Sequence, residues 1–201
     1  LYRQDVENFP NIHFDRHLYQ PLLLAHPDID AMMPPGLNEG EAKFVRDLRD
    51  YLQKNNERFQ GKQIFLLRNL TRGKGIGFFD AKGGEAFYPD FILWVIEDNE
   101  QRIAFIDPHG LRMAQGGFND PKIRLHKELE QLELSSQDGR WSVYMTSFII
   151  STSLYADLQR VFGTGNYRKH EFYLEHVLFQ EDSDYIQRLL DQLLSLPGRS
   201  F

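Results

Sequence analysis

The sequence predicts an α/β fold in which helices flank a mixed central sheet. Helix-like and strand-like stretches alternate along the 201 residues, which favours a layered architecture. Two apolar stretches on either side of a polar turn at residues 97–100 carry apolar residues on both faces, as central strands covered by helices do. Apolar residues make up 41% of the chain and aromatic residues 13%, which is enough for one sizeable core.

The chain divides into three expected segments. Residues 1–37 are a lead-in or linker segment, too short and too often interrupted by proline to form a domain. Residues 38–162 contain the core, and residues 163–201 are a C-terminal strand–helix extension that we expect to pack on it. The chain opens at Leu1 without an initiator methionine, so we expect it to be a piece of a longer protein.

The composition restricts the partners. A net charge of −6 at pH 7 argues against strong DNA binding by this chain alone, because DNA-binding domains neutralise phosphates with a basic face. A nucleic-acid substrate would therefore be delivered by another domain or subunit. The absence of cysteine excludes disulfides and thiolate metal sites, and we expect a cytoplasmic location. No apolar run reaches the roughly 18 residues that span a bilayer, so we expect no membrane partner.

The best helix signal spans residues 38–54. Asn38 is a good N-cap, and Glu41 stands three residues later, where a capping box places an acid. Helical spacing puts Glu41 on the apolar stripe of this helix, so we expect its side chain to face the sheet. The stripe consists of Phe44, Val45, Leu48 and Leu52.

Further strands and helices are expected in order along the chain. The first strand is at residues 63–67, and a strong strand at 87–96 returns through the polar turn into a strand at 101–106. A helix at 120–134 begins with Pro121 at its first position. The remaining expected elements are a strand at 141–152, a helix at 154–162, a short strand at 176–180 and an amphipathic helix at 184–196.

A glycine-rich stretch at 72–77 follows the first strand. It lacks the Gly-Lys-Ser/Thr spacing of a phosphate-binding P-loop, so a hairpin or flexible loop is expected there. Basic residues are dense around it, at Arg68, Arg72, Lys74 and Lys82. We expect Arg72 and Lys74 to contact nucleic-acid phosphates, against the alternative of a plain solvated loop.

The hairpin geometry brings two acidic residues together. If Ile96 pairs with Gln101 across the turn, the register places Asp90 directly opposite Asp107. Directly opposed side chains share one face of the sheet, with Cβ atoms roughly 5 Å apart. Strand alternation puts His109 on that face as well.

Two carboxylates at this separation among apolar strand residues are unfavourable without a counter-ion. They repel each other, and one of them tends to take up a proton. A divalent cation removes the conflict, and Mg²⁺ or Mn²⁺ prefers oxygen ligands while keeping several waters. The sequence therefore predicts a cation site at Asp90 and Asp107.

The same residues resemble a nuclease signature. Pro89-Asp90, followed by Asp107-Pro108-His109 at the end of the next strand, is similar to the PD-(D/E)xK nuclease superfamily. The expected order of elements over residues 38–155 matches the αβββαβ core of that superfamily. The stretches at 87–94 and 105–111 most resemble nuclease domains fused behind helicases in type III restriction enzymes and related defence proteins.

The resemblance implies a restriction-endonuclease-like fold and hydrolysis of DNA phosphodiesters with Mg²⁺ or Mn²⁺. Asp90 and Asp107 would be metal ligands, and Glu41 an auxiliary ligand or a group that orients water. His109 occupies the position at which the family has lysine, and a histidine there can act as a general base.

The exchange of lysine for histidine leaves the activity open, because it can preserve catalysis, alter its pH profile or mark a degenerate site. A replacement cation could come from the following helix, where Lys122, Arg124 and Lys127 stand. We count Lys122 among the expected nucleic-acid contacts. Glu41 is also fully explained by its capping role, and Pro-Asp at a strand start often marks a turn.

Three functional hypotheses remain. The first is a metal-dependent endonuclease domain, the cutting module of a larger restriction or antiphage-defence enzyme whose fused or associated helicase delivers DNA, with homodimerisation left open. The second is a catalytically degenerate nuclease-like domain that binds DNA or docks to a protein. The third is an unrelated metal hydrolase in which His109 is a metal ligand.

Overall fold

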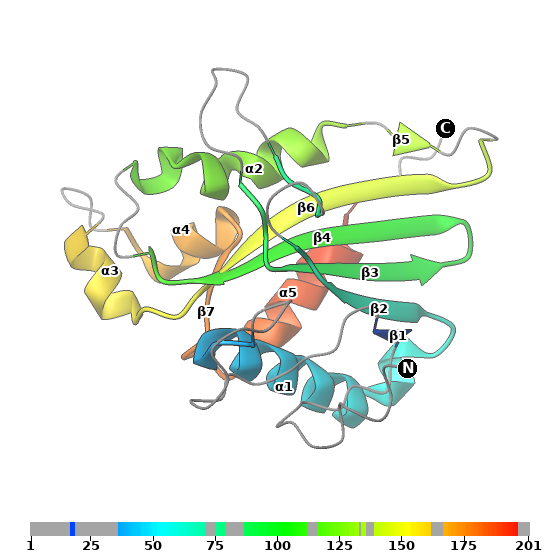
Figure 1. Cartoon of the computed structure of the whole chain (residues 1–201), viewed down its shortest axis with the longest axis horizontal. Helices are drawn as coiled ribbons and strands as arrows, with labels where there is room; N and C mark the ends of the chain where they lie inside the picture. The colour runs from blue at the N-terminus through cyan, green and yellow to red at the C-terminus, as the bar shows by residue number, and fades with distance from the viewer. Residues whose placement is uncertain are drawn as a thin grey trace.

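A computed structural model shows an α/β fold in which one mixed sheet lies between helices on its two faces (Figure 1). The main elements follow the αβββαβ order expected from the sequence. They are α1 (Glu39–Lys54), β2 (Gln63–Arg68), β3 (Phe91–Glu97), β4 (Glu100–His109), α2 (Pro121–Glu130) and β6 (Ser142–Ser151). The structure describes residues 17–18, 36–70, 75–78, 87–111, 116–132, 134–135, 139–161 and 167–196.

Shorter elements complete the described part of the chain. They are β1 (His17–Leu18), η2 (Asn56–Phe59), η4 (Gly117–Asn119), β5 (Leu134–Ser135), α3 (Tyr155–Val161), α4 (Lys169–Leu174), β7 (Val177–Phe179) and α5 (Tyr185–Leu194). Within the described residues, seven strands form one sheet in the order β1-β2-β3-β4-β6-β5, with β7 paired to β6. The elements without a counterpart among those expected from the sequence are β1, η2, η4, β5 and α4.

The β3–β4 hairpin has the register expected from the sequence. Ile96 pairs with Gln101, and both strands continue until the turn contains Asp98 and Asn99 alone. Asp98 adopts a φ of 49°, a conformation that aspartate and asparagine tolerate better than most residues. On one side of the hairpin β2 pairs with β3 in antiparallel fashion, and on the other side β6 pairs with β4 in parallel.

β3 begins later than the apolar pattern indicates. Pro89 has no backbone N–H to donate to a neighbouring strand, and the strand begins at Phe91 rather than at Phe87. Phe87 instead pairs with Phe78 in an isolated antiparallel bridge. β4 continues to His109, because β6 provides a parallel partner along its whole length.

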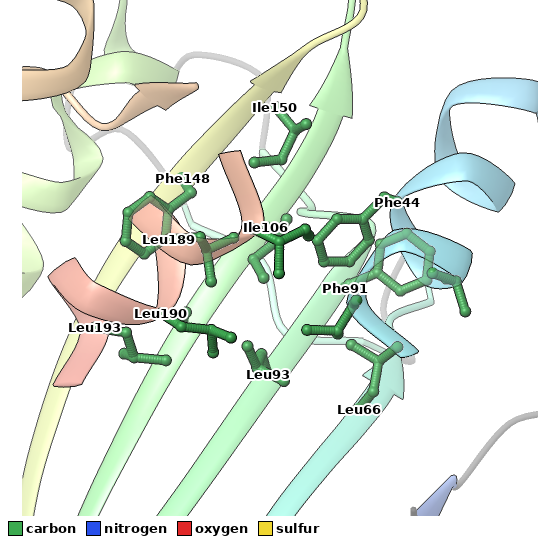
Figure 2. Packing of buried hydrophobic residues seen from close by; sticks show 14 of the residues in the cluster. Phe44, Leu66, Phe91, Leu93, Ile106, Phe148, Ile150, Leu189, Leu190 and Leu193 are labelled. Atoms are coloured by element: carbon green, nitrogen blue, oxygen red, sulfur yellow. The ribbon is translucent and has the colours of Figure 1, made fainter. Parts of the chain in front are cut away.

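One face of the sheet packs against α1 and α5. Phe44 of α1 lies against Phe91 of β3, with ring centroids 5.4 Å apart, and α5 adds leucines to the same cluster (Figure 2). Burial of apolar area at roughly 25 cal/mol per Å² makes this cluster the main source of stability. The residues labelled in Figure 2 are Phe44, Leu66, Phe91, Leu93, Ile106, Phe148, Ile150, Leu189, Leu190 and Leu193.

The opposite face packs against α2. Leu125 and Leu129 of this helix cover a patch of apolar side chains from the central strands, namely Ile92, Ile103 and Phe105. Strand alternation puts Asp107 on the same face as Phe105. A smaller cluster from α3, α4 and β7 lies beside this one. The two faces therefore divide the expected site, because Asp107 belongs to the α2 face and Glu41 comes from α1.

The C-terminal residues take part in the same sheet and core. β7 pairs with β6, and α5 shares a buried cluster with α1. Most of the lead-in at 1–37 lies outside the described residues. In the described part of the chain, no helix combines the length and the apolar character needed to cross a membrane.

Candidate functional site

Asp90 and Asp107 meet at one end of the central strands. The pairing of β3 with β4 ends with Phe91 opposite Ile106, and an aspartate comes next on each side, Asp90 just before β3 and Asp107 within β4. The two carboxyl groups lie within hydrogen-bonding reach of each other. The backbone N–H of Asn69 donates to the carbonyl oxygen of Asp90 at 2.8 Å, which extends the β2 pairing to this position. The expected juxtaposition of the two acids is thus present.

The environment of Asp90 favours the protonated form of its carboxyl group. Burial raises the pKa of Asp90 to about 8, and the charge of Asp107, a hydrogen bond with that residue and the charge of Glu41 act in the same direction. Arg68 opposes them by lowering the pKa. In the protein alone, the acid pair therefore holds a proton at neutral pH.

Asp107 has an oxygen that lacks a hydrogen-bond partner. The residue is 5% exposed, and its buried Oδ2 accepts no hydrogen bond. Lys122 Nζ lies 3.6 Å from this oxygen. A buried carboxylate oxygen without a donor is costly, so this atom is suited to a cation.

Lys122 is positioned by the start of α2. Asp120 caps this helix by accepting a hydrogen bond from the Lys122 backbone N–H at 2.9 Å, and Pro121 occupies the first helical turn. The Lys122 ammonium also lies 4.9 Å from the ring centroid of Phe87. The side chain is 40% exposed, so its ammonium group contacts Asp107 and is also accessible to solvent.

Glu41 is buried, as expected from its place on the helix stripe, but its oxygens are already occupied. Asn38 donates to it twice, from the backbone N–H at 3.0 Å and from Nδ2 at 2.8 Å, and the Asn38 side chain accepts from the Glu41 N–H at 2.9 Å. This is the expected capping box. Arg68 Nη2 lies 3.5 Å from Glu41 Oε2.

Arg68 is a component of the site that the sequence interpretation placed elsewhere. It was expected in a basic neighbourhood around the glycine-rich loop, yet it is buried, with 7% of its surface exposed. Burial lowers the pKa of its guanidinium, while Glu41 and Asp90 raise it. The signal was available, because Ile64 and Leu66 alternate inward along β2 and Arg68 continues that alternation.

Asn69 is a second component that sequence reasoning missed. Its Nδ2 donates to the carbonyl oxygens of Ile76 and Pro89, each at 2.8 Å, and its Oδ1 accepts from the Ile76 N–H at 3.0 Å. The side chain thereby ties the end of the glycine-rich loop to the residue before Asp90. An asparagine after a strand offers no pattern that distinguishes this role from an ordinary turn.

His109 ends β4 and is exposed. Its backbone continues the pairing with Ser151, and its carbonyl oxygen accepts from the Thr152 N–H at 3.2 Å. Among the described side chains, no three His, Asp or Glu groups are arranged to hold a metal ion. The structure therefore brings Asp90 and Asp107 together without making a three-residue metal centre from either His109 or Glu41.

The remaining expected cations differ in their accessibility. Arg124 is exposed on α2, whereas Lys127 forms an ion pair with Glu175 at 2.6 Å. Arg72 and Lys74 lie outside the described residues.

The acid pair fits a divalent cation by its donor chemistry. Mg²⁺ is commonly held by one or two carboxylates and completes its coordination with water and substrate oxygens. Asp90 and Asp107 supply two such carboxylates, one of which has an unbonded buried oxygen. No protein-family model, curated protein or solved structure matches this chain. The nuclease resemblance of residues 87–111 accordingly stays a prediction.

Proposed function

We propose that this chain is a metal-dependent endonuclease domain that hydrolyses DNA phosphodiesters. The observation that carries the proposal is the pair Asp90 and Asp107: the half-buried Asp90 has a strongly raised pKa, and the buried Asp107 beside it has an oxygen without a donor. Such a pair is unfavourable for the protein alone and becomes favourable with a cation.

The residues around the pair divide the chemical tasks. Asp90 and Asp107 would hold Mg²⁺ or Mn²⁺, which when bound supplies charge stabilisation at the phosphate and a more acidic water. Lys122, beside Asp107 and partly exposed, places a positive charge where a substrate phosphate would approach. His109 is exposed at the end of β4, where it could act as a general base toward a water molecule.

The proposal includes a partner that delivers the substrate. With a net charge of −6, the chain is poorly suited to capture DNA unaided. We infer that it is the cutting module of a larger restriction or antiphage-defence enzyme in the cytoplasm, with a fused or associated helicase that brings DNA to Asp90 and Asp107. Homodimerisation is compatible with this arrangement and is part of the same test.

A plasmid-nicking assay tests the proposed activity. Wild-type protein with Mg²⁺ or Mn²⁺ is expected to nick supercoiled DNA, and Asp90→Asn and Asp107→Asn are expected to lose the activity by a factor of about 100 or more, because each removes a carboxylate at the cation site. Asp98→Asn in the hairpin turn is the matched control, since it changes an exposed aspartate of the same hairpin and should leave nicking unchanged. Sedimentation of the same samples reports the oligomeric state.

A catalytically degenerate DNA-binding or docking domain is the second candidate. It is favoured by the histidine at the expected lysine position and by the absence, among described side chains, of a three-residue metal centre. Calorimetric titration with Mn²⁺ separates the two functions, because a docking domain needs no cation. A gain of nicking in His109→Lys would indicate that the natural site is weakened, and absence of both binding and nicking would support the docking domain.

A further inference from the structure

Arg68 contacts Glu41, and its charge also acts on Asp90. Its Nη2 is 3.5 Å from Glu41 Oε2 and 3.5 Å from the carbonyl oxygen of Gly36. Its strand position pairs with Phe91, the residue next to Asp90, and its charge acts on the Asp90 carboxyl group. A buried, permanent cation therefore stands where the α1 side of the site meets the hairpin.

The contacts of Glu41 argue against its movement toward a cation at the acid pair. Both of its oxygens accept hydrogen bonds from Asn38. The Arg68 guanidinium adds an ionic contact, and the side chains of Arg68 and Glu41 are only 7% and 10% exposed. Hydrogen bonds to charged groups in such surroundings are stronger than those between neutral groups. If Glu41 left them, it would leave Arg68 buried without its closest carboxylate, which is costly.

Arg68 also opposes an additional positive charge in its neighbourhood. Two cations at separations of several ångströms in a partly dry site repel each other appreciably. Its Nη1 is buried and has no hydrogen-bond partner, so the guanidinium is not fully compensated by the groups around it. A nearby divalent cation would add to this imbalance.

We propose that Arg68 is a positioning residue that keeps Glu41 on the α1 cap, so that Asp90 and Asp107 are the carboxylates that hold the cation. This inference rests on the proposed metal-dependent function. It replaces the expected three-acid site with a two-acid site and assigns Glu41 and Arg68 to an ion pair that limits cation affinity.

Calorimetric titration of the full chain with Mn²⁺ tests the inference without reference to activity. Asp90→Asn and Asp107→Asn are expected to weaken binding by about 100-fold or more, and Glu41→Gln by less than about threefold. Arg68→Gln is expected to tighten binding by about fivefold to tenfold, because it removes a repelling charge and releases Glu41. Arg68→Lys keeps the charge and should stay within about threefold of wild type.

The double variant Glu41→Gln with Arg68→Gln provides a readout that a purely structural arginine would not affect. Its affinity is expected to fall back toward that of wild type, because the freed carboxylate is no longer present, so the two substitutions are non-additive. Thermal unfolding in EDTA checks that each variant is folded. If Arg68→Gln does not fold, the comparison of Glu41→Gln with Asp90→Asn still decides whether Glu41 is a ligand.

Three results are contrary to the inference. Weakening of Mn²⁺ binding by Glu41→Gln as strong as that caused by Asp90→Asn would make Glu41 a ligand. Weaker or unchanged binding by folded Arg68→Gln would exclude the positioning role while leaving the proposed function intact. Absence of Mn²⁺ binding by wild type would overturn the proposed metal-dependent function, and the inference with it.

Discussion

Asp90 carries an electrostatic cost when the protein is without a cation. Its pKa is raised to about 8 from an ordinary value of 3.8, first by burial and then by Asp107. The folded chain therefore holds a proton over a pH range in which the unfolded chain does not. The contribution of this proton to the free energy of unfolding is fully present below about pH 4 and is lost as the pH rises toward 8.

We predict that Asp90→Asn stabilises the protein in EDTA at alkaline pH. The amide cannot ionise, so the variant avoids the cost of a second buried charge. The expected gain is larger at pH 8.5 than at pH 5 by on the order of 2–4 kcal/mol, because between these values the unfolded chain is ionised at this residue while the folded chain keeps its proton until about pH 8. Urea unfolding at the two pH values measures it, with Asp98→Asn as the control. An equal effect at both pH values would contradict the assigned cause.

Single residues also mark the limit of sequence interpretation at this site. The pairing of Asp90 with Asp107 follows from counting across a hairpin turn, and it could be predicted. The burial of Arg68 could also be predicted from the alternation along β2. The contacts of Arg68 and Asn69 could not, because they depend on where the glycine-rich loop and the start of α1 lie relative to the hairpin. These are tertiary relations that no local pattern contains.

At the scale of elements, the start of α1 is pressed against the end of β6. A Cβ atom added at Gly40 would lie 2.6 Å from Thr152 Cγ2, closer than side chains approach each other. The Gly40 carbonyl oxygen accepts a hydrogen bond from Gln180 Nε2 at 2.8 Å, which ties the same turn to the residue after β7. Gly40 thus permits a close contact that sets the position of the capping box.

We predict that Gly40→Ala destabilises the protein despite the higher helix propensity of alanine. The propensity gain is about 1 kcal/mol, and the steric clash costs about 1–3 kcal/mol, so the net loss is expected at about 1 kcal/mol. Thr152→Ser removes the methyl group that the new Cβ would meet. The double variant should therefore recover the stability of Thr152→Ser in urea unfolding; if it does not, another contact is responsible.

The segment between α4 and β7 contains a histidine whose side chain is 13% exposed. His176 stacks between His126 and Phe148, with ring centroids at 4.2 Å and 4.7 Å. Burial, together with the charges of His126 and Lys127, lowers the pKa of His176 to about 4, and a hydrogen bond to the Ser147 carbonyl oxygen opposes this shift. Its Nδ1 also lies near Thr146 and Glu130.

We predict that His176 makes the protein less stable in mild acid. The unfolded chain binds a proton at this residue below about pH 6.5, and the folded chain binds it near pH 4, so stability present above pH 6.5 is lost between these values. The loss attributable to His176 is at most about 3 kcal/mol. His176→Asn, which tolerates the φ of 54°, should remove this part of the pH dependence in urea unfolding.

The exposed residue His170 provides the control for that measurement. His170→Asn should leave the difference in stability between pH 7 and pH 4.5 unchanged. If His176→Asn behaves in the same way, the acid sensitivity arises from other groups.

The elements themselves were predictable where the periodic signal is long. The capping box of Asn38 and Glu41 predicted the start of α1, and the apolar stripe predicted its buried face. α4 was missed because it has six residues and its N-cap is Arg168, a residue type that is not usual at this position. β1 and β5 have two residues each, too few for any alternation to be recognised.

At the scale of the whole molecule, the α/β class and the order of elements followed from the sequence. The strands expected at 87–96 and 101–106 are apolar on both faces, which indicated helices on the two faces of the sheet. The structure has α1 and α5 on one face and α2 on the other. The assignment of each helix to a face could not be predicted, because an inward stripe is the same on either side. This is why Glu41 and Asp107 were expected to share one cluster.

The hairpin turn at Asp98 and Asn99 lies at the far end of β3 from the acid pair. At about 3.3 Å per residue, the strand separates the turn from Asp90 by roughly 25 Å, and both turn residues are exposed. Because the chain has no cysteine, Asn99→Cys introduces a single thiol for a fluorophore. Such a probe would report docking of DNA or a helicase by anisotropy while leaving the chemistry at the opposite strand ends undisturbed.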